Sequence, residues 1–203
     1  MNQEQYNRLH EIVFSSGNYP GCKPEVKESP NGNGVIDSEK RYAHVAMKYL
    51  REWHSTPFYR WRELYDALFE CHALAVRVAE ELNVPRHLLP SVEYSCLRIL
   101  EYPAGAGSAP HTDFDLFTLA LYRDDPEPFQ SLSGRRLEVD GQETHMGEIG
   151  QLAGLDGALL HAVTPSSQTH RAAVYFAIPD HAAPLGDSTV GAWLAERVAR
   201  SRY

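Results

Sequence analysis

The sequence predicts a mainly β fold with flanking helices and a jelly-roll core. Residues 91–180 consist of short β-type segments separated by Pro- and Gly-rich turns, with no helical periodicity among them. Helical periodicity occurs only before and after this stretch. With 203 residues, the chain is most simply one domain with a sizeable core. We therefore expect a single domain over 1–203, with an N-terminal loop and supporting helices over 1–90, the jelly roll over 91–180 and a C-terminal helix over 187–202.

The N-terminal part begins with a polar segment followed by irregular chain. Residues 15–38 are dense in Gly, Pro, Asn and Ser, which predicts a loop. Such a loop could close over a site as a lid, although a poorly ordered segment is the commoner alternative. Apolar residues then recur at helical spacing over 42–53, with Asp37 or Ser38 available as N-cap. A second helix is predicted over 59–82, where an apolar stripe continues for six turns.

The β-type core is followed by a return to helical periodicity. Its segments are SVEYSCLRILEY, the residues after HTD, RRLEVDG, GALLHAV and RAAVYFAI. The clusters PAGAGSAP, DDPEP and VDG separate these segments and predict turns. From Thr189 to Arg200, the apolar residues lie on one face of a helix. An all-β unit of about ninety residues between helices is typical of a double-sheet barrel.

The composition excludes several classes of partner. The formal net charge of −8 disfavours a nucleic-acid backbone, because phosphate binding requires clustered Lys and Arg. No segment approaches the ~20 apolar residues of a membrane span, and the polar N-terminus lacks the apolar core of a signal peptide. Three widely spaced cysteines form no CxxC pair, which indicates a reducing compartment and no thiolate zinc site. We expect a cytoplasmic protein whose partner is a small molecule.

Three residues are candidates for a metal site. His111 and Asp113 open an apolar strand, HTDFDLF, and residues two apart on a strand point to the same face. His161 lies inside the apolar run GALLHAV, where an imidazole is costly unless its nitrogens are satisfied. A core histidine bonded to a backbone carbonyl is the alternative for His161 taken alone. Two histidines and one carboxylate facing into a barrel would form the facial triad that leaves open coordination positions on non-haem Fe(II).

Arg171 is a candidate for binding a carboxylate. It follows His161 by ten residues and opens the strand RAAVYFAI, with no obvious acidic partner beside it in the sequence. An inward-facing arginine is costly unless it meets an anion, and a dicarboxylate cosubstrate would supply one in bidentate geometry. A surface arginine at a strand edge is the alternative.

Four segments in order carry a resemblance to a known family. LRILEYP, HTDFDLFTL, GALLHAV and RAAVYFAIP, within about 94–179, resemble the catalytic barrel of the Fe(II)/2-oxoglutarate-dependent oxygenases. The most similar group is the isopenicillin N synthase-like branch. The resemblance implies a double-stranded β-helix, which is a cupin-like jelly roll. It also implies that the enzyme uses Fe(II), 2-oxoglutarate and O₂ to oxidise an unactivated C–H bond of a small molecule, with release of succinate and CO₂.

The resemblance also implies roles for individual residues. His111, Asp113 and His161 take the positions of the iron ligands. Arg171 and Tyr102 take the positions of the residues that bind the distal carboxylate of 2-oxoglutarate. Because relatives that halogenate replace the aspartate, Asp113 indicates hydroxylation, desaturation or ring closure instead.

One departure from the family pattern keeps other functions open. The family usually has Arg-x-Ser, whereas Ala173 stands at the serine position here. Loss of one hydrogen bond to a charged group would weaken 2-oxoglutarate binding by roughly ten- to a hundredfold. The alternatives are therefore an Fe(II)-dependent oxidase of the same fold that does not use 2-oxoglutarate, and a non-catalytic jelly-roll binding module.

Strand periodicity predicts which side chains line the pocket. The face of Tyr102 should also carry Arg98, Cys96 and Tyr94, and the face of Arg171 should carry Ala173, Tyr175 and Ala177. The candidate substrate contacts are Arg98, Asp115, Phe117 and Tyr175. Arg98 and Asp115 could instead pair with each other or reach water. Surface positions are expected for His170 and His145, and a packed position for His72. The sequence determines neither the substrate nor the oligomeric state.

Overall fold

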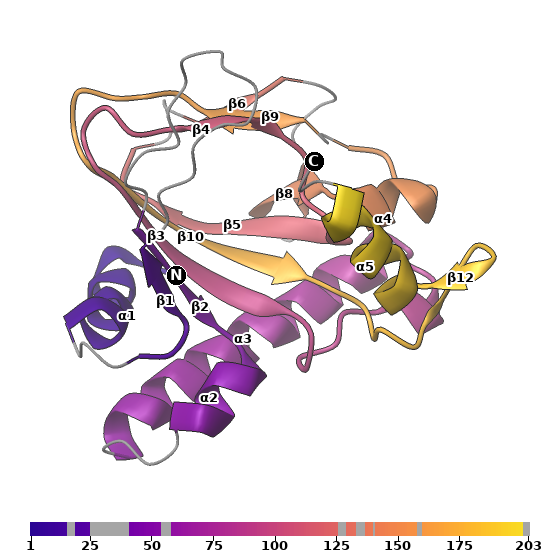
Figure 1. Cartoon of the computed structure of the whole chain (residues 1–203), viewed down its shortest axis with the longest axis horizontal. Coiled ribbons are helices and arrows are strands. Elements are labelled where there is room, and N and C mark those ends of the chain that lie inside the picture. Colours follow the sequence, from indigo (N-terminus) through magenta and orange to yellow (C-terminus); the bar gives the residue numbers. More distant parts are fainter. Residues whose placement is uncertain are drawn as a thin grey trace.

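The computed structural model describes residues 1–15, 19–24, 41–53, 58–125, 129–132, 137–139, 141–157 and 160–200. Two antiparallel sheets lie over each other, and long helices cover the outer face of the larger one (Figure 1). The larger sheet has the strand order β1-β2-β3-β10-β5-β8-β7, and the smaller sheet has the order β4-β9-β6. The predicted mainly β fold with a jelly-roll core and flanking helices is confirmed.

The strands and helices have the following bounds. The larger sheet consists of β1 (Cys22–Pro24), β2 (Arg41–Val45), β3 (Cys96–Tyr102), β5 (Phe117–Arg123), β7 (Leu137–Val139), β8 (Gln142–Met146) and β10 (His170–Ala177). The smaller sheet consists of β4 (Ser108–His111), β6 (Phe129–Ser131) and β9 (His161–Val163), and β11 (Pro184–Leu185) pairs with β12 (Ser188–Thr189). The helices are α1 (Gln3–Ser15), α2 (Met47–Trp53), α3 (Phe58–Glu81), the 3₁₀ turn η1 (Arg86–Leu88), α4 (Glu148–Leu152) and α5 (Val190–Arg200).

The N-terminal region differs from the prediction. The helix expected over 42–53 is wrong in its first half, because β2 pairs with β3 and only Met47–Trp53 is helical. The few apolar residues of this segment fit both the helical and the strand period. The segment forms a strand because the edge of β3 was free to pair with it. The large sheet thus extends beyond the predicted core over 91–180. The helix α1 was not predicted, because only four of its thirteen residues are buried. Asp37, Ser38 and most of the loop over 15–38 lie outside the described residues.

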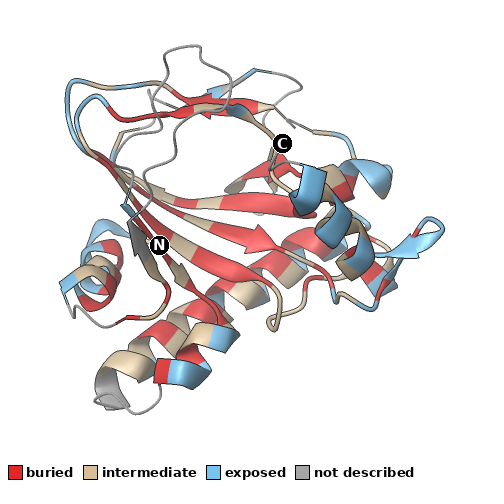
Figure 2. Ribbon diagram, in the orientation of Figure 1, coloured by how far each residue is buried: buried red, intermediate tan, exposed pale blue. Residues whose placement is uncertain are grey.

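The predicted helix over 59–82 is confirmed as α3, which lies against the outer face of the larger sheet (Figure 2). Leu64 and Leu68 of α3 are fully buried in one core with Leu97 and Leu119 of the sheet. Full burial of such side chains contributes about 1.5–3 kcal/mol each. This core makes the sheet a rigid support for groups on its other face.

The predicted C-terminal helix is confirmed as α5, and it is anchored close to the turn after β4. Arg197 Nε lies 2.7 Å from Glu148 Oε2 at the start of α4. Glu148 in turn accepts a hydrogen bond from the Thr112 hydroxyl, and its backbone N–H donates to the carbonyl of Asp113. Across the described parts of the chain, no helix combines the length and apolar character that crossing a membrane requires.

Candidate metal centre and adjoining cavities

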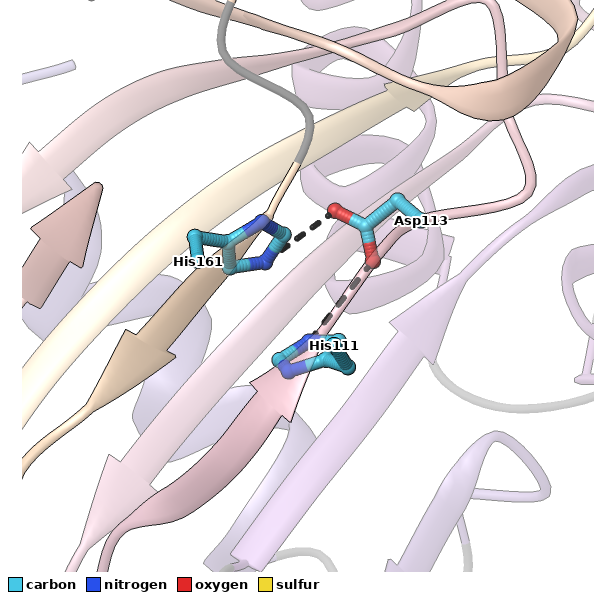
Figure 3. A group of neighbouring side chains, drawn as sticks. All are labelled: His111, Asp113 and His161. Carbon is cyan, nitrogen blue, oxygen red and sulfur yellow. Dashed lines mark ion pairs between the residues drawn. The ribbon is translucent and has the colours of Figure 1, made fainter. Parts of the chain in front are cut away.

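The smaller sheet brings two histidines together. His111 ends β4 and His161 begins β9, and the two residues are direct partners in the antiparallel pairing. Directly paired residues share a face of a sheet, so both imidazoles point to the same side. Asp113 lies two residues beyond β4 and completes the group (Figure 3). The Nε2 atoms of His111 and His161 lie 3.9 and 3.5 Å from the two carboxylate oxygens of Asp113, and all three residues offer ligand atoms within 4.8 Å of one another.

The hydrogen bonding of His111 presents a lone pair to this group. Its Nδ1 lies 2.8 Å from the carbonyl oxygen of Ala109, which can only accept, so Nδ1 carries the proton. In a neutral imidazole Nε2 is then unprotonated, which is the form that coordinates a metal. Two imidazoles and one carboxylate on one side of a cluster match the facial donor set of non-haem Fe(II) sites.

A threonine supports Asp113 from the larger sheet. The Thr118 hydroxyl lies 3.0 Å from Asp113 Oδ2 and 2.6 Å from Asp115 Oδ2. Asp115 is 1% exposed, and its burial, followed by the charge of Asp113, raises its pKa well above the usual range. The Thr118 hydroxyl has a single proton and can donate it to only one of the two carboxyl groups at a time. A neutral Asp115 carries a proton of its own and can donate the second hydrogen bond among these three side chains. Asp115 thus shares the Thr118 hydroxyl with Asp113, and it also borders the outer cavity.

Two cavities border the candidate metal group. The inner cavity lies between the sheets, and its polar lining beyond the three candidate ligands consists of Arg98, Tyr102, Thr118, Arg123, Asp125, His145, His170 and Arg171. The outer cavity has a volume of about 870 Å³. Both cavities are lined by Arg98, His111, Asp113 and Phe176, whereas His161 lines the inner one, so two of the three candidate ligands lie where the cavities meet.

Of the cavity-facing set predicted for β10, Arg171 borders the inner cavity, but Ala173, Tyr175 and Ala177 line neither cavity of the described structure. β10 pairs with β3 so that His170 lies opposite Tyr102 and Val174 opposite Arg98. Since Tyr102 and Arg98 line the inner cavity, as predicted, the even-numbered residues of β10 do so as well. Ala173, Tyr175 and Ala177 are instead completely buried in the core that includes α3. The error arose because the register between strands is a tertiary property that strand periodicity cannot supply.

Arg171 has the acidic partner that the sequence did not reveal. It borders the inner cavity at the start of β10, but its Nε lies 3.2 Å from Oε2 of Glu101, its direct neighbour on β3. Glu101 also meets His10 of α1 at 2.9 Å and Arg41 of β2 at 3.2 Å. The expectation that Arg171 lacks an acidic partner is wrong. Its role toward 2-oxoglutarate stays a prediction, against which this ion pair counts.

Two predicted substrate contacts are wrong, and Ala173 has a different place from the one expected. Phe117, Tyr175 and Ala173 are completely buried in the core between the larger sheet and α3. The Tyr175 hydroxyl lies 3.0 Å from Nδ1 of His72, which has the packed position expected for it. None of the three residues lines either cavity in the described structure. The missing serine hydroxyl at position 173 therefore does not affect the lining of these cavities.

Two histidines expected on the surface are buried beside the site. His170 is 5% exposed and stacks on Tyr102 with ring centroids 4.6 Å apart. His145 is 3% exposed, its ring lies 5.9 Å from that of His161, and its Nε2 lies 2.7 Å from Glu143 Oε1. The segment QETHM forms β8, not the predicted turn, which explains the error for His145. The only feature of the sequence that could have indicated burial of His145 was the alternation of strand positions around it.

Arg123 was also missed. A β-bulge between β5 and β10 pairs Arg123 with the cavity-lining Ala172, and its side chain is only 11% exposed. Its Nη1 lies 3.2 Å from Glu143 Oε1. Because the bulge shifts the alternation of β5, simple period-two reasoning does not place Arg123 in the cavity.

Comparison with known proteins reveals a shared fold. No protein-family model matches this sequence, and no curated protein matches it. The similar solved structures include a Shewanella oneidensis protein that is described provisionally as an oxygenase. Its TM-score is 0.62 at 19% sequence identity, and the match covers 98% of this chain and 87% of that one. A full-length Neurospora crassa protein, solved in complex with alpha-KG and thymine, has TM-score 0.59, 11% identity and coverage of 99% and 85%. The dioxygenase for auxin oxidation from rice has TM-score 0.57, 12% identity and coverage of 99% and 83%.

These similarities extend over almost the whole chain. The predicted resemblance to the Fe(II)/2-oxoglutarate-dependent oxygenases is confirmed at the level of the fold. They do not single out the isopenicillin N synthase-like branch. At identities of 11–19%, the shared architecture leaves substrate and reaction to be argued from the residues of this chain.

Proposed function

We propose that this protein is an Fe(II)- and 2-oxoglutarate-dependent oxygenase acting on a small molecule. The observation that carries the proposal is the convergence of His111, Asp113 and His161 at the junction of two cavities. The similar structures lend support, since the Neurospora crassa protein was solved in complex with alpha-KG and thymine. The outer cavity, at about 870 Å³, has the size of a small-molecule site.

The donor set fits Fe(II) in both charge and geometry. Neutral imidazoles and one carboxylate leave a divalent ion with one positive charge, so that an anionic cosubstrate can join it. When bound, Fe(II) with 2-oxoglutarate supplies the dioxygen chemistry that oxidises a C–H bond and yields succinate and CO₂. The chain itself would hold His111 Nε2 unprotonated through Ala109, fix Asp113 through Thr118, and exclude water between its sheets.

We assign 2-oxoglutarate to the inner cavity. On this proposal its distal carboxylate is directed toward Arg123, with Tyr102 and His170 beside it, away from the metal group. The side chain of Arg123 is 11% exposed, compared with 43% for Arg171. A more deeply buried guanidinium interacts more strongly with a carboxylate than one near solvent does. Both arginines already form an ion pair at 3.2 Å, Arg123 with Glu143 and Arg171 with Glu101, so the assignment rests on the greater burial of Arg123.

Visible absorption tests the metal and the cosubstrate together. Anaerobic apo-protein is mixed with Fe(II) and then with 2-oxoglutarate, and the charge-transfer absorption of the complex is recorded. We expect a band that requires both components and disappears in His161→Ala. Iron binding without a band would favour the Fe(II) oxidase, and failure to bind Fe(II) would favour the non-catalytic binding module.

The same band separates the two arginines. The 2-oxoglutarate concentration for half-maximal absorption is compared for Arg123→Gln, Arg171→Gln and wild type. Loss of a charge-assisted pair in Arg123→Gln should raise this concentration by about tenfold or more, whereas Arg171→Gln should change it less. If Arg171→Gln raised this concentration more than Arg123→Gln did, Arg171 would be the residue that binds 2-oxoglutarate.

The oxidase alternative rested on Ala173 at the usual serine position. That side chain is completely buried toward α3, so its lack of a hydroxyl says nothing about the cosubstrate. Among the described residues, we find no other feature that favours the oxidase.

A further inference from the structure

Arg98 lies at the border between the inner and the outer cavity. It lies at the middle of β3, between His44 of β2 and Val174 of β10, and it lines both cavities. Its guanidinium carbon lies 4.3 Å from the ring centre of Phe176 and 5.3 Å from that of Tyr42. The two rings hold the cation beside the candidate metal group.

This cation lacks a carboxylate partner in the part of the chain that the structure describes. The Nε atom of Arg98 is buried and has no hydrogen-bond partner there. Glu93, Asp113 and Asp115 border the same outer cavity, and the charge of Arg98 counteracts the rise of the Asp115 pKa, but among the described residues none of these carboxyl groups forms an ion pair with Arg98. Arg98 is partly buried and, as an arginine, stays protonated, so its charge lies beside the cavity with a buried N–H that is not satisfied. Aromatic faces attract a guanidinium, yet they do not accept its N–H hydrogen bonds in the way that oxygen atoms do.

The other arginines around the site have such a partner. Arg123 pairs with Glu143, Arg171 with Glu101, and Arg197 with Glu148. An anionic group that enters the outer cavity could therefore accept hydrogen bonds from Arg98, whose guanidinium N–H groups are not used by a carboxylate of the described residues. The planar guanidinium matches a carboxylate in bidentate geometry.

We infer that Arg98 binds the carboxylate of the substrate, which assigns the outer cavity to small carboxylic acids with an apolar or aromatic body. This inference rests on the proposed function. Tyr42, Tyr94, Phe114 and Phe176 line the outer cavity and supply apolar contact for such a body. Because Arg98 borders the same cavity as His111 and Asp113, a carboxylate held there leaves the body of the substrate beside the metal group. Glu93 and Asp113 in the same lining disfavour a doubly charged phosphate.

The test compares acids with their neutral counterparts. The probes are benzoate, phenylacetate, indole-3-acetate and naphthalene-1-acetate, each paired with its primary amide, with phenyl phosphate as a separate anion. Zn(II)-loaded protein with saturating 2-oxoglutarate gives NMR spectra free of paramagnetic broadening. The Arg98 Nε–H signal, identified by its loss in Arg98→Gln, is followed during each titration, and other signals report binding to the variants.

We expect at least one acid to bind about tenfold or more tightly than its amide and to shift the Arg98 signal. Arg98→Gln should lose this preference. Arg62→Gln should keep it, because Arg62 lies on the exposed side of α3, paired with Asp66. Equal binding of every acid and amide, an unchanged preference in Arg98→Gln, or stronger binding of phenyl phosphate than of the acids would overturn the inference.

The Fe(II)–2-oxoglutarate band separates this inference from the proposed function. A band that is retained in Arg98→Gln, together with a lost acid preference, supports the role of Arg98 toward substrate. A band lost only in Arg98→Gln would place Arg98 with the cosubstrate and overturn the inference. No band in wild type would contradict the proposed function, whereas an acid preference measured on the Zn(II) protein would still establish the carboxylate site.

Discussion

Thr118 links the candidate ligand Asp113 to the buried Asp115. Thr118→Val keeps the shape of the side chain but removes both hydrogen bonds of the hydroxyl, at 3.0 Å to Asp113 and 2.6 Å to Asp115. Supporting contacts of this kind typically contribute 10- to 100-fold to metal affinity. We expect Thr118→Val to weaken anaerobic Fe(II) binding by about that factor in a titration, and Thr118→Ser to restore most of it. Unchanged Fe(II) affinity in Thr118→Val, or a loss in Thr118→Ser as large as the loss in Thr118→Val, would contradict a specific role of the hydroxyl.

At the scale of elements, α3 and β10 meet through a titratable pair. His72 of α3 lies 3.0 Å from the Tyr175 hydroxyl of β10, and burial lowers the pKa of this histidine below its usual 6.5. The unfolded chain therefore binds a proton at His72 before the folded chain does. Stability from the neutral His72 is present above about pH 6.5 and declines as the pH falls toward the folded-state pKa.

The variant that tests this element contact is His72→Gln, which can still hydrogen bond to Tyr175 but does not titrate. We expect the free energy of unfolding of wild type to fall more steeply between pH 7 and 5 than that of His72→Gln. Urea denaturation at several pH values measures both slopes. Because burial also lowers the pKa of His170 and His181, the slope of the variant should be reduced and not abolished. Parallel curves would show that His72 does not contribute.

At the scale of the whole molecule, the candidate ligands join the two sheets. His111 and His161 belong to the smaller sheet, and Asp113 is tied through Thr118 to the larger one. A metal that binds only the folded chain stabilises it by about 2.7 kcal/mol at a hundredfold excess over Kd. For a chain of this size, this corresponds to a rise in Tm of several degrees. We expect Mn(II) to produce this rise by calorimetry in wild type but not in His161→Ala; an equal rise in both would indicate binding elsewhere.

The predictable part of the fold is the part that local physics governs. The long apolar stripe of α3 and the change to short strands after it are visible in sequence, because the helix and strand periods differ over such lengths. The residues of β2 are too few to distinguish the two periods, and only the edge of β3 selected a strand. The helix α1 was likewise not predictable, because its composition is mostly polar and only a narrow apolar face packs on the sheet.

The candidate site divides in the same way. The spacing of His111 and Asp113 and the apolar surroundings of His161 are properties of the sequence, and they sufficed to predict the three residues that the structure brings together. Which residues line the cavities depended on strand register, since a shift of one position exchanges the two faces of a strand. The pairing of His170 with Tyr102 and the bulge before Arg123 decided this lining. Both arise from contacts between segments that are distant in the chain, so they cannot be predicted from a local sequence pattern.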